Sequence, residues 1–322
     1  MLIATAGTAL LLVVAVSSAR AARRRLRYES WHLLHLYAYL GVGLALPHQL
    51  WTGSDFIATP AARIFWWGLY GATLTTIVVF RLALPLARSL RHGLRVVGVV
   101  EEAPGVVSVH LRGRRLDRLP SRAGQFFHWR FLDGPGWSRA HPYSLSSAPD
   151  PRRLRITVKD RGDGSQRVQS LRPGTRVLFE GPFGRLTPAV RTSRRVTLLA
   201  CGIGITPMRS LLEELRGPES SIVLIYRARR EEEIVFRDEL DALGREPGVR
   251  VVYVLGGRAH DTWLPARLAH LDGDDALRRI VRTIARNDVY VCGPEEWMTA
   301  AVDAAERAGV PRGRIHVEHF GW

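Results

Sequence analysis

The chain has 322 residues, a length typical of two or three domains. Its net charge of +16 raises nucleic acid as a partner, but ten arginines lie before residue 96 against two acidic residues. Half of the basic excess therefore flanks apolar segments, a pattern typical of membrane topology, and we expect no nucleic-acid partner. The two cysteines exclude a four-cysteine iron–sulfur cluster.

Three apolar segments predict a helical membrane domain over residues 1–94. They are Leu2 to Ser18, Trp31 to Trp51 and Ile64 to about Leu84. The arginine-rich stretch between the first two is predicted to be cytoplasmic, so the second helix runs outward and the third returns. We therefore expect a multi-pass protein of the inner or plasma membrane with its polar remainder in the cytoplasm. A signal peptide is the alternative for the first segment, but no basic residue precedes it.

The second segment carries two histidines, His35 and His48, which are candidate metal ligands. They lie 13 residues apart, a helical rise of about 20 Å, so one falls in each leaflet. Two neutral imidazoles at two depths suit two b-type haems. An ideal helix would not align the two rings, although Pro47 can re-aim the second. His32 competes as the inner ligand, and His32 and His35 could instead be interfacial residues.

Residues 95–192 read as short β-rich runs separated by Pro and Gly turns, which predicts a small antiparallel β-barrel. Within it, "RAHPYSLSSAP" offers a fixed turn at Pro142, a flat ring at Tyr143 and a hydroxyl at Ser144. Downstream, the "GDGS" turn from Gly162 to Ser165 could direct amides at a pyrophosphate. Taken singly, each motif is also consistent with a purely structural turn.

Residues 193–322 alternate apolar strands with amphipathic helices, one of them around residues 231–243, which predicts a parallel α/β sheet covered on both faces. After the first strand, "CGIGITP" places Gly202 and Gly204 where a phosphate could approach the backbone. Thr206 and Pro207 are predicted to open the next helix. Position 207 would hold the third glycine of the usual dinucleotide fingerprint, so the motif departs from that pattern.

Two further stretches of this region point to a nucleotide. Arg227 and Arg229 follow the second strand, where they would suit a 2′-phosphate, so NADPH is favoured and NADH is the alternative. A solvated charge run, partly neutralised by Glu231 to Glu233, is the structural interpretation of the same residues. The late strand ends in "VCGP", which places Cys292, Gly293 and Pro294 at the ligand edge of the sheet.

The motif order "HPYSLSSAP", "GDGS", "EGPFG", "CGIGITP", "VCGP" and "EHF" resembles the ferredoxin-NADP reductase superfamily over about residues 95–322. With a histidine-bearing membrane segment in front, the chain resembles the ferric reductase and NADPH oxidase branch of that superfamily. The resemblance implies a haem-binding helical bundle, an FAD-binding barrel and a pyridine-nucleotide domain.

The resemblance also assigns roles to residues. It implies flavin contacts from His141, Pro142, Tyr143 and Ser144, and contacts to the FAD pyrophosphate from Gly164 and Ser165. It implies that Gly202, Gly204, Thr206 and Pro207 hold the dinucleotide phosphates, that Cys292 and Glu318 border the nicotinamide, and that Phe320 covers the flavin. Because the chain continues to Trp322, that ring could take the place of Phe320. Family members use histidine pairs on two helices, and here one helix carries them, so a complete haem pair needs upstream sequence, a partner chain or a homodimer.

The sequence therefore predicts an NADPH oxidoreductase that uses FAD and, through haem b, passes electrons across a membrane. Ferric chelates, oxygen and quinones are all candidate acceptors. The alternative is a membrane-anchored flavin reductase without haem that donates electrons to a cytoplasmic protein.

Overall fold

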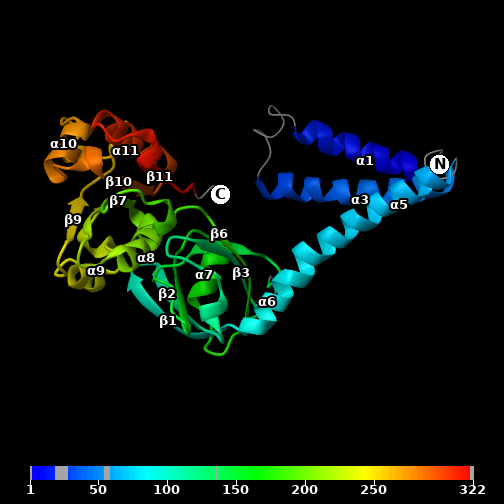
Figure 1. The fold of residues 1–322 in the computed structure, drawn as a ribbon, viewed down its shortest axis with the longest axis horizontal. Coiled ribbons are helices and arrows are strands. Elements are labelled where there is room, and N and C mark those ends of the chain that lie inside the picture. The colour runs from blue at the N-terminus through cyan, green and yellow to red at the C-terminus, as the bar shows by residue number, and fades with distance from the viewer. Residues whose placement is uncertain (1, 19–27, 54–58, 135–136, 320–322) are drawn as a thin grey trace. The chain divides into compact units, whose positions relative to one another are not determined.

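The computed structural model describes residues 2–18, 28–53, 59–134 and 137–319, without the side chains of residues 28–36 and 163. The chain divides into two compact units, Met1–Ala83 and Leu84–Trp322 (Figure 1). The first unit is helical. The second holds two β-rich domains, so the sites considered below lie within it.

The first unit consists of α1 (Leu2–Ser18), α3 (Tyr28–Thr52), α5 (Pro60–Ile77) and a π-helical turn η1 (Val78–Ala83). α1 and α3 pack along each other, and α3 continues through Pro47. α5 begins at Pro60, where Thr59 caps the helix by accepting a hydrogen bond from the amide of Ala62 at 3.2 Å.

The helix that starts at Pro60 continues without interruption to His92. By length and composition it could cross a membrane, and it is the one helix of the described residues that meets this test. Leu2–Ser18 is a shorter apolar helix. Three spans were predicted, whereas the described residues supply one full-length candidate, and the side chains of the first part of α3 lie outside them.

The second unit opens with α6 (Leu84–His92), which packs on the barrel strand β6 (Val177–Phe183). The hydroxyl of Ser89 is 3.1 Å from the carbonyl oxygen of Phe179 and accepts from the amide of Phe179 at 3.0 Å. His92 is 3% exposed. The buried face of α6 therefore ties the end of the apolar helix to the barrel.

The barrel consists of two three-stranded antiparallel sheets, ordered β1-β2-β5 and β4-β3-β6. Bridges between Arg95 and Arg176 and between Leu145 and Ile156 join the two sheets at both edges, so the sheets close around one apolar core. The elements are β1 (Arg95–Ala103), β2 (Val106–Arg112), β3 (Phe126–Phe131), β4 (His141–Ser144), β5 (Arg153–Lys159), α7 (Asp163–Gln169) and β6 (Val177–Phe183).

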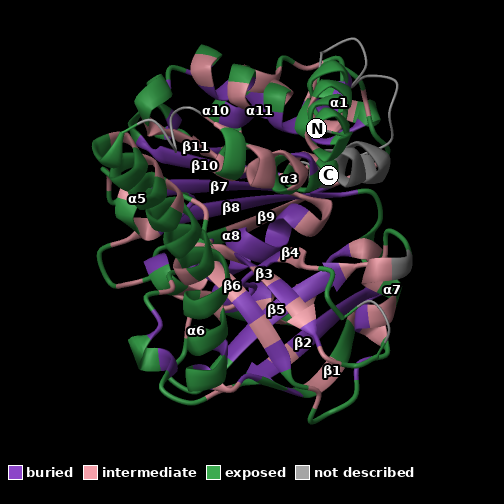
Figure 2. Cartoon of the chain, turned by 90° about the vertical axis from the view of Figure 1, so that its right-hand side faces the viewer, coloured by how far each residue is buried: buried purple, intermediate pink, exposed green. Residues whose placement is uncertain are grey.

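The last domain is a parallel sheet of order β11-β10-β7-β8-β9 with helices on both faces. Figure 2 shows the strands β10, β7 and β8 of this sheet buried between those helices. One core lies under α8 and α9 and the other under α10 and α11. The elements are β7 (Arg195–Cys201), α8 (Ile205–Leu215), β8 (Ser221–Ala228), α9 (Arg237–Leu243), β9 (Val249–Leu255), α10 (Gly273–Ile280), β10 (Asp288–Cys292), α11 (Glu295–Arg307) and β11 (Ile315–Val317).

The antiparallel barrel and the parallel α/β sheet confirm the predicted fold class of the chain after residue 94. Two details differ from the prediction. α8 begins at Ile205, because a short 3₁₀ turn over Gly202–Gly204 already bends the chain into the helix. The predicted helix over residues 231–243 is divided into a 3₁₀ turn, Glu231–Glu233, and α9, because Phe236 between them adopts a left-handed conformation.

Candidate functional site

Ser144 lies at the end of β4, opposite Phe126 of β3. The residue is 5% exposed, and its hydroxyl has no hydrogen-bond partner among the described residues. An unsatisfied buried hydroxyl costs about 1–3 kcal/mol, so such groups normally find a partner. The arrangement therefore leaves a polar group ready for a ligand at the position where the sequence predicted one.

Two aromatic rings precede this hydroxyl on the same strand. The rings of His141 and Tyr143 stack with centroids 6.0 Å apart and planes at 12°. Burial raises the pKa of Tyr143 to about 12, so the phenol is neutral at physiological pH. Burial, assisted by the charges of Arg167 and Arg139, lowers the pKa of His141 and favours its neutral form. The strand thus carries two flat, uncharged rings, the kind of group on which an isoalloxazine stacks. The ring of His141 is half-buried, and that of Tyr143 is 9% exposed and packs with the barrel core.

The "GDGS" turn lies against these rings. A methyl group on Gly164 would lie 2.7 Å from Cε1 of His141, so this close approach requires glycine. The hydroxyl of Ser165 accepts from the amide of Arg161 at 2.7 Å and lies 2.8 Å from the carbonyl oxygen of Gly162. The side chain of Ser165 therefore stabilises the turn, while the turn itself is held beside the predicted flavin strand.

The C-terminal segment returns to the barrel at Glu318. Its Oε2 accepts from the amide of Arg185 at 3.3 Å, and a methyl group on Gly184 would lie 3.2 Å both from this oxygen and from Cδ1 of Phe126. The "EGPFG" turn and Glu318 therefore lie beside Phe126 of β3, the strand that pairs with the predicted flavin strand β4. The predicted shielding rings, Phe320 and Trp322, lie outside the described residues.

The two glycine turns of the parallel sheet also meet. A methyl group on Gly204 would lie 2.2 Å from the carbonyl oxygen of Cys292, and one on Gly293 would lie 2.8 Å from Cβ of Cys201. Thr206 is buried and donates its hydroxyl to the carbonyl oxygen of Ile203 at 3.0 Å. The side chain of Thr206 thus closes the first helical turn. Pro207 lies within that turn and does not open it, since α8 starts at Ile205.

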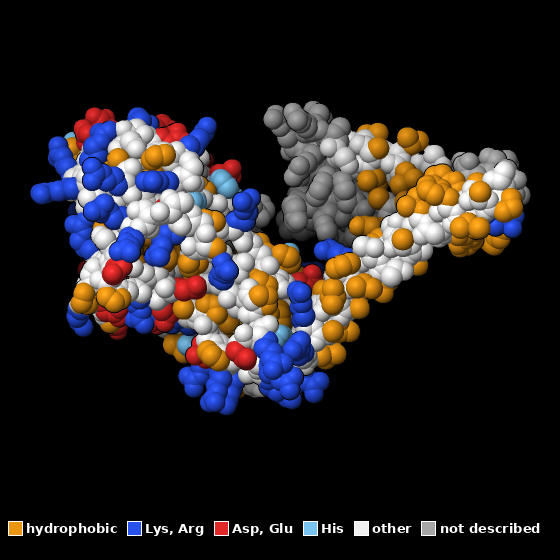
Figure 3. Space-filling model, in the orientation of Figure 1, with side chains coloured by type: hydrophobic (Ala, Val, Ile, Leu, Met, Phe, Trp, Pro, Cys, Tyr) orange, Lys and Arg blue, Asp and Glu red, His pale blue; other side chains and the backbone are white. Residues whose placement is uncertain are grey.

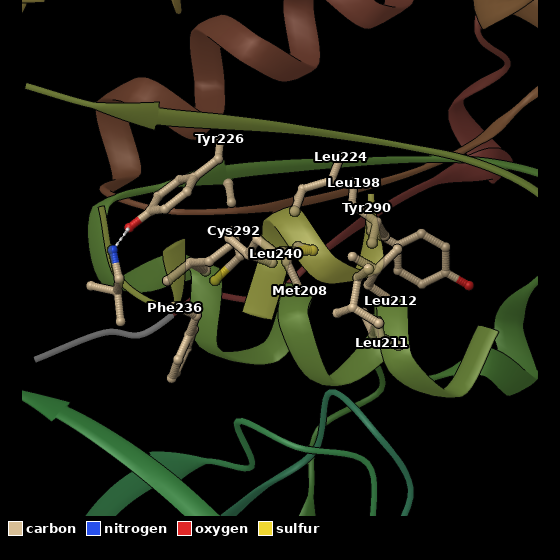
Figure 4. Close-up of a cluster of buried hydrophobic side chains, with 14 of the residues drawn as sticks. Leu198, Met208, Leu211, Leu212, Leu224, Tyr226, Phe236, Leu240, Tyr290 and Cys292 are labelled. Carbon is tan, nitrogen blue, oxygen red and sulfur yellow. Dashed lines mark hydrogen bonds between the residues drawn. The ribbon is translucent and has the colours of Figure 1, made fainter. Parts of the chain in front are cut away.

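Cys292 is fully buried. Burial, followed by the charge of Glu318, raises the pKa of its thiol. Figure 4 shows its side chain within the hydrophobic cluster that includes Met208 and Leu240. A ligand at this edge would therefore meet the backbone of the turn at Gly293 and the exposed Pro294, because the sulfur is enclosed.

Arg227 differs from the prediction. It is 4% exposed, and its guanidinium donates to the carbonyl oxygens of Ala228 and, at 2.7 Å, of Gly257. It therefore ties the end of β8 to the loop after β9 and is already committed to the fold. Arg229 is exposed just beyond β8 and stays a candidate for the 2′-phosphate.

Sequence reasoning missed a charged cluster that joins the two domains. Arg155 of β5 and Arg209 of α8 both donate to the carbonyl oxygen of Ser146, at 3.0 and 3.3 Å. Glu239 pairs with both arginines, and Glu213 accepts from the amide of Ala148 at 2.7 Å. The stretch that follows the flavin motif is therefore held on the helix that follows the nucleotide turn. The position of Arg209 on the apolar face of an amphipathic helix was the sequence feature that could have indicated this cluster.

The predicted haem ligands are not brought together by the described residues. His48 is half-buried on α3, and its Nδ1 lies 3.0 Å from the hydroxyl of Thr52. The side chain of His35 lies outside the described residues, and α1 and α5 contain no histidine. Within the part of the chain that the structure describes, no bis-histidine pair is assembled.

Comparison with known proteins places this site in a family. Residues 198–303 match the family model described as an oxidoreductase NAD-binding domain. The chain is 33% identical to ferredoxin–NADP reductase B of Sorangium cellulosum over 62% of its own length and 84% of that protein. It is also 33% identical to the ferredoxin reductase component of 3-ketosteroid-9-alpha-monooxygenase of Mycolicibacterium smegmatis, over 70% of its own length and 65% of that protein.

A solved structure agrees on the fold. The ferredoxin NADP⁺ reductase of Neisseria gonorrhoeae with bound FAD and NADP superposes with a TM-score of 0.57 and 23% identity. The superposition covers 70% of this chain and 96% of the other. The chain belongs to the ferredoxin-NADP reductase superfamily, with FAD- and NAD(P)-binding domains.

Proposed function

We propose that the chain is a membrane-anchored, NAD(P)H-dependent FAD reductase that passes electrons to a separate acceptor protein. The observation that carries the proposal is the buried, unpartnered hydroxyl of Ser144. It lies on a strand with two stacked neutral rings, and that strand pairs with β3, which borders the turn that Glu318 contacts. A flavin ring would supply the missing hydrogen-bond partner.

The residues of the site would hold and orient the cofactors. Bound FAD would accept a hydride from NAD(P)H and release electrons singly. Tyr143 and His141 would stack on its ring, the turn at Gly164 would face its pyrophosphate, and Ser144 would hydrogen-bond the reacting edge. The turn at Gly202–Gly204 would receive the nucleotide phosphates, with Glu318 at the nicotinamide.

A protein acceptor is favoured by the relatives, one of which is named as the ferredoxin reductase component of a monooxygenase. Haem is not part of the proposal, because the described residues supply one candidate ligand, His48, and a bis-histidine site needs two. Ferric iron, oxygen and quinones stay sequence predictions.

Membrane anchoring is supported by the helix Pro60–His92, whose most apolar stretch has no buried residue. Its exposed apolar side chains include Ile64, Phe65, Leu74 and Phe80, which bilayer lipid would cover. We expect the helix to cross the inner or plasma membrane. The basic residues that follow it favour the cytoplasmic side of that membrane for the barrel and the nucleotide domain.

The test uses the full chain in membranes. After an alkaline wash we expect the chain to stay in the membrane fraction with stoichiometric FAD. Under anaerobic conditions NAD(P)H should bleach the flavin band, and an added ferredoxin should restore it. Absence of flavin, or release by the wash, would contradict the proposal. A Soret band with a split α-band that is lost in His48→Ala would replace the protein acceptor with a haem path.

A further inference from the structure

Four arginines lie side by side across the outer surface of the barrel. Arg95 of β1 is opposite Arg112 of β2, Arg112 is opposite Arg153 of β5, and Arg95 also bridges to Arg176 just before β6. All four are exposed, and residues directly opposite each other share one face of a sheet. With about 5 Å between neighbours, this arginine row spans about 15 Å.

No carboxylate forms an ion pair with any residue of the arginine row in the described part of the chain, although like charges directly opposite each other destabilise a sheet. Some exposed arginines of the nucleotide domain, for example Arg194, Arg216 and Arg237, each pair with an acidic side chain. Others, for example Arg279 and Arg282, have no ion pair in the described structure, so the arginine row is set apart by four unpaired arginines that are adjacent in the sheets. The guanidinium of Arg95 donates to the carbonyl oxygen of Gly174 at 2.9 Å, a contact that leaves its charge in place. The arginine row therefore keeps a concentrated positive charge that no carboxylate of the described structure neutralises.

The arginine row is extended by the loop that follows β2. A pocket of about 380 Å³ is lined by Arg112, Arg114, Arg115 and Arg152 together with Gly113, Asp117 and Pro151. Four of these seven residues are arginines and one is acidic. A pocket with this lining favours anionic oxygens.

The same loop is fastened to the end of the apolar helix. The amide of Arg114 donates to the carbonyl oxygen of His92 at 2.8 Å, and Nδ1 of His92 lies 3.0 Å from the carbonyl oxygen of Arg114. Arg95 follows His92 by three residues, a separation of at most about 10 Å. Figure 3 shows Lys and Arg side chains gathered over this end of the barrel, beside exposed apolar side chains of α6, of which Leu86 and Leu90 are 50% and 69% exposed.

We propose that the arginine row and its pocket bind the anionic headgroups of the membrane in which the helix Pro60–His92 is anchored. This inference rests on the membrane anchoring proposed above. The chain itself brings the arginine row close to lipid, phosphate and carboxylate headgroups match guanidinium donors, and exposed leucines beside the arginines suit the interface. The contact would fix the barrel against the bilayer, so that the flavin-bearing edge is presented to its acceptor in a set orientation.

An acidic acceptor protein is the competing occupant of this surface. Arg153 begins β5, whereas the "GDGS" turn of the cofactor site follows the other end of that strand, six residues or about 20 Å away. A protein seated on the arginine row would therefore stand at the far end of the strand from that turn. The distance of the arginine row from the cofactor turn therefore favours a contact that orients the barrel. It argues against the binding of a protein that receives electrons there.

The test reconstitutes the full chain in phosphatidylcholine nanodiscs and in nanodiscs with about 30% phosphatidylserine. Trypsin cleavage after Arg114 and Arg115, followed by mass spectrometry, reports access to the pocket. We expect phosphatidylserine to slow cleavage about tenfold at low salt, and high salt to reverse the effect. The triple variant R95Q/R153Q/R176Q should lose the lipid effect, the lysine triple R95K/R153K/R176K should keep it, and the matched control R279Q/R282Q/R286Q on the nucleotide domain should be unchanged.

Equal cleavage in the two lipids, or a lipid effect that survives in the glutamine triple, would overturn the inference. Protection in neutral lipid by an added ferredoxin, and not by phosphatidylserine, would assign the surface to an acidic protein and overturn it as well. Release of the chain from the nanodiscs by alkaline washing would instead contradict the proposed membrane anchoring. Failure of the proposed function is therefore distinguished from failure of this inference.

Discussion

Ser144 in the barrel and Arg227 in the nucleotide domain were both predicted to bind a cofactor, and both are at least nine-tenths buried. The hydroxyl of Ser144 has no partner in the described structure, whereas the guanidinium of Arg227 is occupied by backbone carbonyl oxygens. Burial alone therefore does not distinguish a binding residue from a structural one. The distinction lies in whether the surrounding fold already satisfies the polar atoms of the residue.

The largest expected effect follows from Ser144→Ala. Removal of one positioned hydrogen-bond donor commonly slows a reaction about 10²- to 10³-fold, so we expect flavin reduction by NAD(P)H to slow about 10²-fold with FAD retained. The cofactor-free protein should become more stable by about 1–3 kcal/mol, because an unsatisfied hydroxyl is removed. Stopped-flow absorbance and chemical unfolding measure the two changes.

Ser146→Ala is the matched control for that experiment. Its hydroxyl accepts from Oγ1 of Thr157 at 2.8 Å and is fully buried. The alanine variant should therefore lose about 1 kcal/mol of stability, the opposite sign from Ser144→Ala. If both variants lost stability and neither slowed flavin reduction, Ser144 would be a structural residue and the comparison with Arg227 would fail.

The local motifs were predictable because each depends on neighbouring residues. "HPYS" and "GDGS" carry a ring, a hydroxyl and a glycine turn within a few positions, and their cofactor contacts stay predictions. Arg227 is enclosed because its strand, "SIVLIYRA", lies inside a parallel sheet and is buried from Ile222 to Ala228. The continuous run of apolar residues before Arg227 indicates that the end of this strand is buried.

Contacts between distant parts of the chain could not be predicted. Arg209 and Ser146 are 63 residues apart, and their contact depends on how the barrel docks on α8. The arginine row likewise depends on the register of β1, β2 and β5, which no spacing in the chain reveals. Motifs formed by neighbouring residues can therefore be predicted from this sequence. Which charged side chains are paired depends on contacts between distant residues and cannot.

Substitution of Arg229 and of Arg227 should change different properties, and each change should be smaller than that expected for Ser144→Ala. Arg229→Ala should raise the KM for NADPH about tenfold and leave that for NADH unchanged, since a charge-assisted hydrogen bond is worth about 1.5–3 kcal/mol. Arg227→Ala should instead lower the free energy of unfolding by about 2 kcal/mol, because buried carbonyl groups lose their donor. Steady-state kinetics with both nucleotides and urea unfolding separate the two. A selective loss of NADPH affinity in Arg227→Ala, with stability intact, would reverse the roles given to the two arginines.

The smallest effect concerns pH and the neutral form of His141. Burial, Arg167 and Arg139 lower its pKa in the folded chain below the ordinary value of 6.5, so the unfolded chain binds more protons in the window between the two values. Stability must therefore fall as the pH drops below 6.5. His141→Gln removes this group, and the variant should lose less melting temperature between about pH 7 and pH 5 than the native chain. The fold lowers the pKa of Glu239 from 4.5, so the stability that its carboxylate contributes is lost only at lower pH. His270 is exposed, and the variant His270→Gln serves as the control. An equal loss in the native chain and in His141→Gln would show that His141 charges freely in the folded protein, and the stacked pair would then not present two neutral rings to a flavin.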